Sequence, residues 1–260
     1  MPDRVLLSAV AFVLGLIVGS FLNVVIHRLP RGESVVSGRS KCPACGGKIA
    51  WYDNVPLLSF VLLRARCRRC GAAISPRYPA VELLTGLIAG LAVWFLGVTA
   101  EAVFAFVFFA LLLVITLIDW SHRIIPDTLS LGGTAFGLFG AAVFLDIAFA
   151  DVLAGAVLGG GILYLVAVGY RAVRKAEGMG GGDVKLMAMI GAFVGWRMVF
   201  PVLMLASLGG ALYGLYLMRR GASGRAAIAF GSFLAPSAAL VYVFGADLWR
   251  AYLDFFLGRP

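Results

Sequence analysis

Long apolar stretches separated by short polar segments make up most of the chain. A bilayer core about 30 Å thick requires roughly 20 apolar residues in a helix that crosses it. Eight stretches meet or approach this length, and we expect each of them to form a membrane-spanning helix. They run approximately over Val5–Ile26, Ala80–Leu96, Ala102–Ile118, Thr128–Leu145, Val152–Tyr170, Val184–Gly195, Met198–Met218 and Gly231–Tyr252.

The sixth and seventh stretches could also be taken as one helix. However, Val184 to Met218 is too long for a single crossing at about 1.5 Å per residue. Gly195, Trp196, Arg197 and Pro201 offer a turn between them. The composition agrees with many crossings, since 62% of the residues are hydrophobic and 13% are charged, against about 25% charged in a soluble domain. The pattern predicts an all-α polytopic membrane protein with about eight transmembrane helices.

The basic residues indicate how these helices are oriented. The segment from His27 to Pro79 holds ten of the 22 Lys and Arg residues, and an excess of such residues marks a cytoplasmic loop. Alternation then places 18 of the 22 on the cytoplasmic side. Merging the sixth and seventh helices would put Arg219 and Arg220 outside. Topology and anionic lipids explain the net charge of +9, so we expect membrane lipids as partners and no nucleic acid.

The cytoplasmic segment contains all four cysteines, as two CxxC pairs. Cys42 and Cys45 form the first pair, Cys67 and Cys70 form the second, and 21 residues separate the pairs. Two pairs at this separation resemble a structural zinc site with four thiolate ligands. Gly46, Gly47 and Gly71 follow the pairs, where a tight knuckle turn favours a residue without Cβ. We therefore predict a small zinc-ribbon-like loop domain.

Other roles for these cysteines are less consistent with the sequence. Disulfides are disfavoured because the cytoplasm is reducing, and a redox CxxC would be expected once, beside a βαβ pattern. Four protein ligands would leave no open position on the metal for a reacting water. The expected division of the chain is a first transmembrane helix at 1–27, a four-Cys loop domain at 28–79 and a seven-helix transmembrane core at 80–256.

Two aspartates lie where apolar stretches meet the cytoplasmic side. Asp119 ends the third stretch and Asp183 opens the sixth, so topology brings both to one membrane depth although they are 64 residues apart. An ionisable residue in such a place is costly and marks a functional site. Two carboxylates that share a proton can activate water against a peptide bond. We predict that Asp119 and Asp183 form a catalytic pair.

Residues close to this pair have both structural and functional interpretations. Asp183 could instead cap the sixth helix and Asp127 could cap the fourth, while Asp127 is also the second choice for a place in the pair. Lys185 could pair with a carboxylate or extend to lipid headgroups. The glycines before Asp183, including Gly180 and Gly182, would let another chain approach the carboxylate closely. Glu82 lies in the first turn of the second helix, where the helix dipole favours an acidic side chain, so we interpret it as structural.

Taken together, these motifs resemble the type IV prepilin peptidases, which are GxGD aspartyl intramembrane proteases, and the likeness covers nearly the whole chain. It rests on an ordered set: GSFLNVVIHRLP at Gly19–Pro30, the two CxxC pairs, YPAVELLTG at Tyr78–Gly86, Asp119 with Ile125–Asp127, and MGGGDVKL at Met179–Leu186. One departure lies at Ala229–Ala235, where Ser232 stands at a position that is often Pro in the family. It lies far from the aspartates in sequence, and we assign it no role.

The resemblance implies a function at the bacterial cytoplasmic (inner) membrane, with the active site facing the cytoplasm. Enzymes of this family cut the basic leader from prepilins and pseudopilins, and many then methylate the new N-terminus with S-adenosylmethionine. The family's catalytic residues fall on Asp119 and Asp183, with Asp127, Gly180, Gly182 and Lys185 in supporting positions. No glycine motif or soluble α/β domain for the methyl donor is present, so its binding residues are unknown at this stage.

Two other classes of protein could carry some of these features. A proton-coupled transporter would also use intramembrane carboxylates, but transport sites usually lie near the midplane of the membrane. A zinc-dependent membrane scaffold would need the cysteines and not the aspartates. No Ser/His or Cys/His arrangement suggests a covalent mechanism. The expected reaction is therefore attack by an activated water, with the two carboxylates as general base and general acid.

Overall fold

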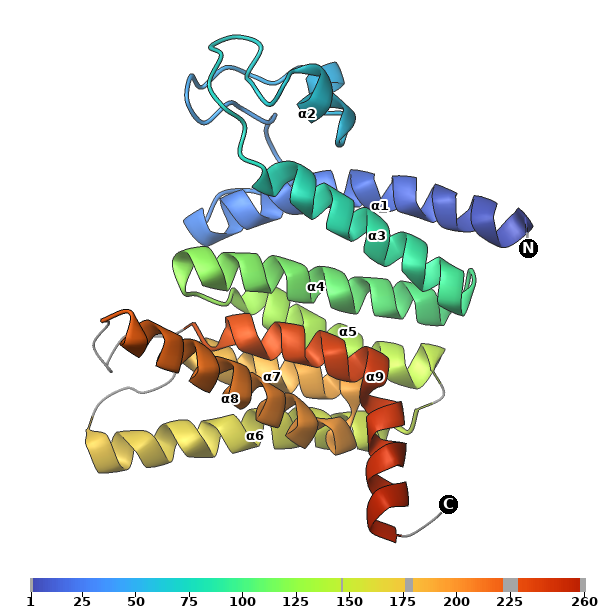
Figure 1. The fold of residues 1–260 in the computed structure, drawn as a ribbon, viewed down its shortest axis with the longest axis vertical. Helices are drawn as coiled ribbons and strands as arrows, with labels where there is room; N and C mark the ends of the chain where they lie inside the picture. Colours follow the sequence, from blue (N-terminus) through green and yellow to red (C-terminus); the bar gives the residue numbers. More distant parts are fainter. Residues whose placement is uncertain (1, 146, 176–179, 222–228, 258–260) are drawn as a thin grey trace. The chain divides into compact units, whose positions relative to one another are not determined.

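The computed structural model describes residues 2–145, 147–175, 180–221 and 229–257. Within these ranges the chain is helical and forms no β-strand (Figure 1). Extended pairing there is limited to two isolated antiparallel bridges, Lys41 with Lys48 and Arg66 with Ala73. The all-α fold expected from the apolar pattern is confirmed.

Each of the eight apolar stretches coincides with a helix. These are α1 (Pro2–Arg28), α3 (Arg77–Leu96), α4 (Ala100–His122), α5 (Asp127–Phe144), α6 (Phe149–Arg174), α7 (Gly181–Val194), α8 (Trp196–Arg219) and α9 (Gly231–Leu257). The segment between α1 and α3 holds a short helix, α2 (Leu58–Leu62), and two 3-10 turns, η1 (Leu29–Arg31) and η2 (Trp51–Asp53).

The structure separates the sixth and seventh helices as predicted. α7 ends at Val194, Gly195 adopts a φ of 74°, and α8 begins at Trp196. The turn is thus made by Gly195, and Pro201 lies inside α8. Among the described residues, five helical segments are long and apolar enough to cross a membrane: 3–31, 77–96, 100–122, 149–174 and 196–219. All eight expected helices are present, but only five of the described segments have the length and hydropathy of a membrane crossing.

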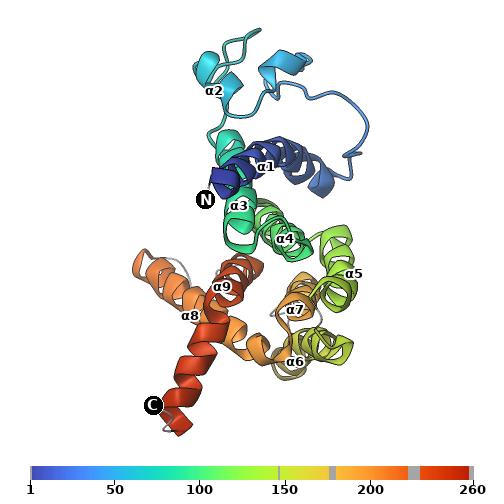
Figure 2. The same ribbon diagram turned by 90° about the vertical axis from the view of Figure 1, so that its right-hand side faces the viewer.

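The chain divides into two compact units, Met1–Ala110 and Leu111–Pro260, with the boundary inside α4. In the first unit α1 packs against α3 (Figure 2). Glycines bring these two helices together, because a Cβ on Gly19 would lie 2.7 Å from Glu82 Cα and one on Gly86 would lie 2.7 Å from Leu16 Cδ2. Small residues at a helix interface allow this close approach of the two backbones.

In the second unit α7 contacts α5, α6, α8 and α9. It is a helix of 14 residues, about 21 Å long and shorter than a bilayer core. Its contact with α6 places Gly155 against Gly191 and Gly159 against the backbone of Met187. Most of its side chains are buried, including Leu186, Met187, Met189, Ile190 and Phe193. The protein therefore surrounds the helix whose first turn contains Asp183.

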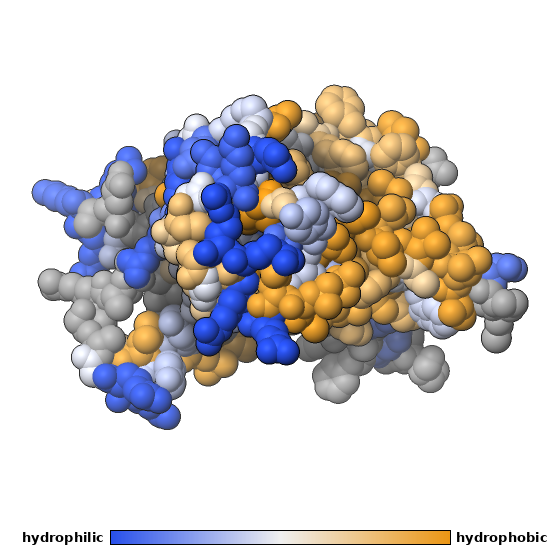
Figure 3. All heavy atoms as spheres, turned by 90° about the horizontal axis from the view of Figure 1, so that it is seen from above, coloured by the Kyte–Doolittle hydropathy of each residue, from blue (hydrophilic) through white to orange (hydrophobic). Residues whose placement is uncertain are grey.

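The surface distribution of side chains agrees with a membrane protein. On α1, large apolar side chains such as Leu6, Val13, Leu14 and Ile17 are more than half exposed. Apolar side chains on the outside of a helix of this length are typical of contact with lipid. Figure 3 shows a face of the molecule on which hydrophilic residues gather on one side and hydrophobic residues on the other.

Candidate active site

Asp119 lies in the last turn of α4 and is 4% exposed. A carboxylate at a helix C-terminus is disfavoured by the helix dipole, so it requires other partners. The Ser232 hydroxyl donates a hydrogen bond to Asp119 Oδ2 at 3.1 Å, and the backbone N–H of Ser232 also interacts with this carboxylate. Ser232 belongs to the first turn of α9. The partner of Asp119 thus comes from a helix more than 100 residues away in the sequence.

Asp183 is the third residue of α7 and is 9% exposed. It does not cap the helix, because Gly180 occupies the N-cap position with an extended backbone (φ −73°, ψ 143°). The Asp183 carboxylate reaches back to the N–H of Gly180, as the acidic residue of a capping box does. It also interacts with the backbone N–H of Gly231 at the start of α9. The cap considered for Asp183 is therefore wrong, and the side chain faces α9.

The two carboxylates therefore share one anchor, the N-terminus of α9, and they interact electrostatically with each other. A helix N-terminus carries a partial positive charge and unpaired N–H groups that stabilise anions. Two buried carboxylates in electrostatic contact favour a state in which they hold one proton between them. Such a pair can act as general base and general acid at the same time.

Glycines allow the helices to approach this pair closely. A Cβ on Gly231 would lie 2.9 Å from Asp119 Oδ2 and 2.8 Å from Ile125 Cδ1. A Cβ on Gly182 would lie 3.0 Å from Ile125 Cβ. Ile125, in the turn between α4 and α5, thus packs between the starts of α7 and α9. Gly180 is less constrained, since its Cβ would meet no atom closer than 3.9 Å.

Asp127 and Lys185 form an ion pair on the surface. Lys185 Nζ donates to Asp127 Oδ1 at 2.7 Å, and the two side chains are 40% and 59% exposed. The N-cap of α5 is Pro126, and no side chain caps this helix, so the cap proposed for Asp127 is wrong. Of the two roles expected for Lys185, the structure shows the pairing with a carboxylate. The pair joins the start of α5 to the start of α7.

Gly231 and Ser232 are site residues that the sequence does not predict. The departure from the family pattern at Ser232 is the signal that points to this segment, although it lies far from the aspartates in sequence. His122, close to Asp119, is exposed. The backbone N–H of Arg123 donates to the Asp119 carbonyl at 2.8 Å and closes α4, with Arg123 at a φ of 55°.

The four cysteines of the first unit come together in a second site. Their Sγ atoms all lie within 4.8 Å of one another, and Cys42 Sγ and Cys70 Sγ are 3.9 Å apart. No disulfide joins them. A tetrahedral zinc ion with Zn–S bonds of about 2.3 Å holds its sulfurs about 3.8 Å apart. The donor set and its spacing thus fit a four-thiolate metal site.

The two CxxC pairs have the same local geometry. In the first, Cys42 N donates to Gly47 O and Gly46 N donates to Cys42 O, both at 2.9 Å. In the second, Cys67 N donates to Ala72 O at 2.8 Å and Gly71 N donates to Cys67 O at 2.9 Å. Gly46 and Gly71 have φ values of 67° and 72°, which favour glycine. The knuckle turns are confirmed at these two glycines.

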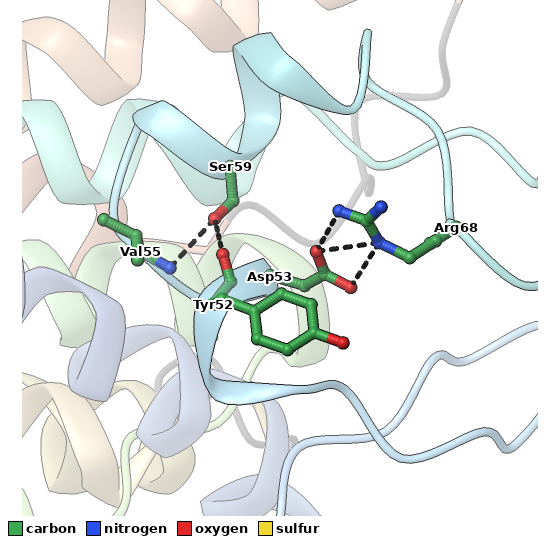
Figure 4. Close-up of polar contacts among 5 residues, drawn as sticks. All are labelled: Tyr52, Asp53, Val55, Ser59 and Arg68. Carbon is green, nitrogen blue, oxygen red and sulfur yellow. Dashed lines mark hydrogen bonds and ion pairs between the residues drawn. The ribbon is translucent and has the colours of Figure 1, made fainter.

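The four thiols influence one another's ionisation. Backbone N–H groups of Cys70 and Arg69 donate to the Cys67 sulfur and lower the pKa of that thiol to about 7, while burial and the neighbouring sulfurs raise the pKa of Cys70 to about 11. The thiolate is the form that binds metals. Arg68, inside the same knuckle, forms a two-pronged ion pair with Asp53 of η2, with Nη2 2.7 Å from Oδ1 (Figure 4). This pair fixes the second knuckle to the 3-10 turn.

Two family models match the chain. Residues 13–96 match the bacterial peptidase A24 N-terminal domain, and residues 106–215 match the type IV leader peptidase family. No solved structure matches the fold significantly.

Curated relatives extend the likeness to most of the sequence. The chain is 46% identical to a prepilin leader peptidase/N-methyltransferase of Myxococcus xanthus, over 85% of this chain and 65% of that protein. It is 38% identical to the protein of the same description from Pseudomonas aeruginosa, over 93% of this chain and 92% of that protein. A relative from Stutzerimonas stutzeri is 36% identical over 94% of this chain. None of these matches supports a transporter.

Proposed function

The chain belongs to the type IV leader peptidase family, and from this premise we propose that it removes the basic leader from prepilins and related pseudopilins and then methylates the new N-terminus. The relatives that match over more than nine-tenths of their length are described as carrying both activities. The protein is a multi-pass protein of the inner membrane.

The observation that carries the peptidase proposal is the meeting of Asp119 and Asp183 at the first turn of α9. We assign the catalytic roles to these two residues. The ionised carboxylate takes a proton from water, and the resulting hydroxide attacks the scissile carbonyl carbon. The protonated carboxyl donates a hydrogen bond to the carbonyl oxygen. A proton then passes to the leaving nitrogen, and the C–N bond breaks to give a carboxylic acid and a free amine.

The neighbouring residues have supporting roles in this proposal. Gly182 lets the start of α7 pack against Ile125, and Gly180 supplies the N-cap whose N–H reaches the Asp183 carboxylate. The surface pair of Asp127 and Lys185 holds the starts of α5 and α7 together. None of these four is assigned a proton-transfer step.

The four cysteines are proposed to bind one structural zinc ion. Four protein thiolates complete a tetrahedral shell and leave no position for a reacting water. The loop at 28–79 is too small to fold on a large apolar core, so metal binding would supply its folding energy. The first helix at 1–27, this loop domain and the transmembrane core at 80–256 are the proposed functional divisions of the chain.

We place the loop domain and the aspartate pair on the cytoplasmic side, because 18 of the 22 basic residues fall on that side when the eight helices alternate. A prepilin leader carries basic residues, which the same rule keeps in the cytoplasm. S-adenosylmethionine is the proposed methyl donor, and when bound it supplies a methyl group on a positively charged sulfur. Membrane lipids surround the helices.

The decisive experiment uses the purified protein in lipid vesicles with a prepilin and S-adenosylmethionine. Mass spectrometry of the pilin N-terminus reads leader removal and the mass of one added methyl group in a single spectrum. We expect Asp119→Asn and Asp183→Asn each to lower the cleavage rate by at least about 1,000-fold, since neither Asn can exchange the proton. Zinc content and thermal unfolding of each variant serve as folding controls. Cleavage at the wild-type rate by either variant would refute the assignment.

A further inference from the structure

A cluster of four aromatic rings lies beside the aspartate pair, and the cleavage steps assign it no role. The rings belong to the second unit and come from three helices: Trp120 from α4, Tyr213 and Tyr216 from α8, and Phe233 from α9. Tyr213 is the centre of this aromatic cluster, because its ring contacts each of the other three. We propose that Tyr213 is a positioning residue for leader cleavage, an inference that rests on the proposed peptidase function. It holds the start of α9 against the end of α4.

Tyr213 connects two helix ends that each carry a residue of the site. Its ring centroid lies 6.2 Å from that of Trp120 and 5.6 Å from that of Phe233, with interplanar angles of 50° and 44°. Aromatic pairs favour inclined or offset rings with centroids about 4.5–7 Å apart. Trp120 directly follows Asp119, and Phe233 directly follows Ser232. One side chain of α8 thus contacts the sequence neighbours of both hydrogen-bonded residues.

The surface of α8 is shaped to receive Phe233. Gly209 precedes Tyr213 by about one helical turn, so both residues lie on the same face of α8, and α8 packs against α9 (Figure 1). A Cβ on Gly209 would lie 3.2 Å from Phe233 Cδ1. The Phe233 ring therefore packs closely over bare backbone and against the Tyr213 ring. This contact fixes where the first turn of α9 lies along α8.

The aromatic contacts and the catalytic contact use different sides of the same two helix ends. Successive side chains of a helix point about 100° apart. Trp120 is 61% exposed, whereas Asp119 is 4% exposed and Ser232 is 7% exposed. The rings thus meet toward the surface, while the Ser232 hydroxyl donates to Asp119 Oδ2 at 3.1 Å in the interior. Each helix end is held at two points, which restricts its rotation about the hydrogen bond.

Asp119 depends on the close approach of α9. Its carboxylate lies in the last turn of α4, where the helix dipole disfavours it. The fit is tight, because a Cβ on Gly231 would lie 2.9 Å from Asp119 Oδ2. Without the Tyr213 ring the start of α9 can move away from Asp119. A displacement of this kind lowers turnover, and it removes no contact that binds the substrate.

The test measures kcat and KM for leader removal by the purified full-length protein in lipid vesicles. We expect Tyr213→Ala to lower kcat by about 10- to 100-fold and to leave KM within about 2-fold of the wild type. Tyr213→Phe keeps the ring and should restore kcat to within about 2-fold of the wild type. Tyr164→Ala makes the same chemical change on α6, at a side chain that is 59% exposed, and should leave both constants unchanged. If thermal unfolding shows that Tyr213→Ala does not fold, Tyr213→Leu, which keeps more of the side-chain volume, carries the test.

A double-mutant cycle identifies the residue through which Tyr213 acts. Ser232→Ala already removes the hydroxyl that Tyr213 is proposed to position. In that background Tyr213→Ala should lower kcat by only about a further 3-fold, because the two changes disturb one contact. Lys185→Met alters the junction of α5 and α7 instead. In that second background Tyr213→Ala should keep its full effect.

Three results would overturn the proposal. A normal kcat for Tyr213→Ala, or a loss that Tyr213→Phe does not restore, would show that the ring positions nothing. A full effect of Tyr213→Ala in the Ser232→Ala background would show that Tyr213 acts elsewhere. A higher KM with an unchanged kcat would place the aromatic cluster in substrate binding. In each case the wild type still removes the leader and the proposed function stands, whereas a wild type that leaves prepilin uncut would refute the proposed function and this inference with it.

Discussion

The cysteine site and the aspartate site are built in opposite ways. All four cysteines fall between residues 42 and 70, and each pair is shaped by hydrogen bonds within its own turn. The aspartate site instead takes Asp119 from α4, Asp183 from α7, and Gly231 and Ser232 from α9. The first site is local in sequence, and the second exists only after three helices have packed. Perturbing one should therefore leave the other largely intact.

The largest expected effect comes from removing a cysteine. Cys67→Ser removes one of four thiolate ligands, and since the folding of such a loop depends on its metal, we expect zinc content to fall to a small fraction of the wild type. Trypsin should then cut the basic segment 28–79 on the order of 100-fold faster, because its proteolysis follows the unfolded population. Zinc content is measured by elemental analysis and cutting by gel densitometry.

Asp183→Asn is the matched control for this experiment. It changes a buried residue of the other unit and should keep full zinc content and full resistance to trypsin in the loop. If Asp183→Asn also released zinc, or if Cys67→Ser kept both the metal and the resistance, the two sites would not be independent in the way their construction implies.

A second prediction compares two adjacent glycines of the GxGD segment. Gly182→Ala places a methyl group 3.0 Å from Ile125 Cβ, while a methyl group on Gly181 meets no atom within 4 Å. Ile125 would have to move, and a shift of the α7 start by a fraction of an ångström can lower the cleavage rate by about 10- to 100-fold. Gly181→Ala should cleave at close to the wild-type rate. Initial rates of leader removal measure both, and equal rates for the two variants would contradict the packing argument.

The sequence predicted those features that depend on local pattern. The length of the apolar stretches predicted eight helices, and the φ values of Gly46 and Gly71 agree with the knuckle turns expected of glycines after CxxC pairs. The equal membrane depth of Asp119 and Asp183 stays a prediction from topology. The electrostatic contact between the two carboxylates could not be predicted, because hydrophobic periodicity gives the face of a helix and not its neighbour.

The errors in the sequence analysis have one common cause. The caps considered for Asp127 and Asp183 assumed that an acid at a helix start serves its own helix. In the structure the Asp127 carboxylate pairs with Lys185 of α7, and the Asp183 carboxylate interacts with Gly231 at the start of α9 as well as with Gly180, the N-cap of its own helix. Ser232 lies 113 residues from Asp119 in sequence, yet its hydroxyl is a direct partner of the Asp119 carboxylate. Tertiary contacts decided each case.

A third prediction tests how α9 supports Asp119. Ser232→Ala removes the hydroxyl that donates to Asp119 Oδ2 at 3.1 Å, and a hydrogen bond to a charged group of this kind corresponds to about a 10-fold lower cleavage rate. Ser232→Pro removes the hydroxyl and the backbone N–H, at a first-turn position where a helix tolerates proline. If the hydroxyl is the main contribution, the two variants should have similar rates. A much slower Ser232→Pro would show that the N–H matters more.

The smallest effect is expected at the surface pair of Lys185 and Asp127. Its atoms are 2.7 Å apart, but both side chains are substantially exposed, and pairs of this kind contribute about 0.2–1 kcal/mol. Lys185→Met and Asp127→Asn should each lower the cleavage rate by no more than about 5-fold, and the double variant by no more than either single variant, because the second change removes no further contact. A double-mutant cycle on initial rates measures this coupling. A loss from Asp127→Asn as large as that from Asp119→Asn would instead place Asp127 in the catalytic pair and change which helices form the site.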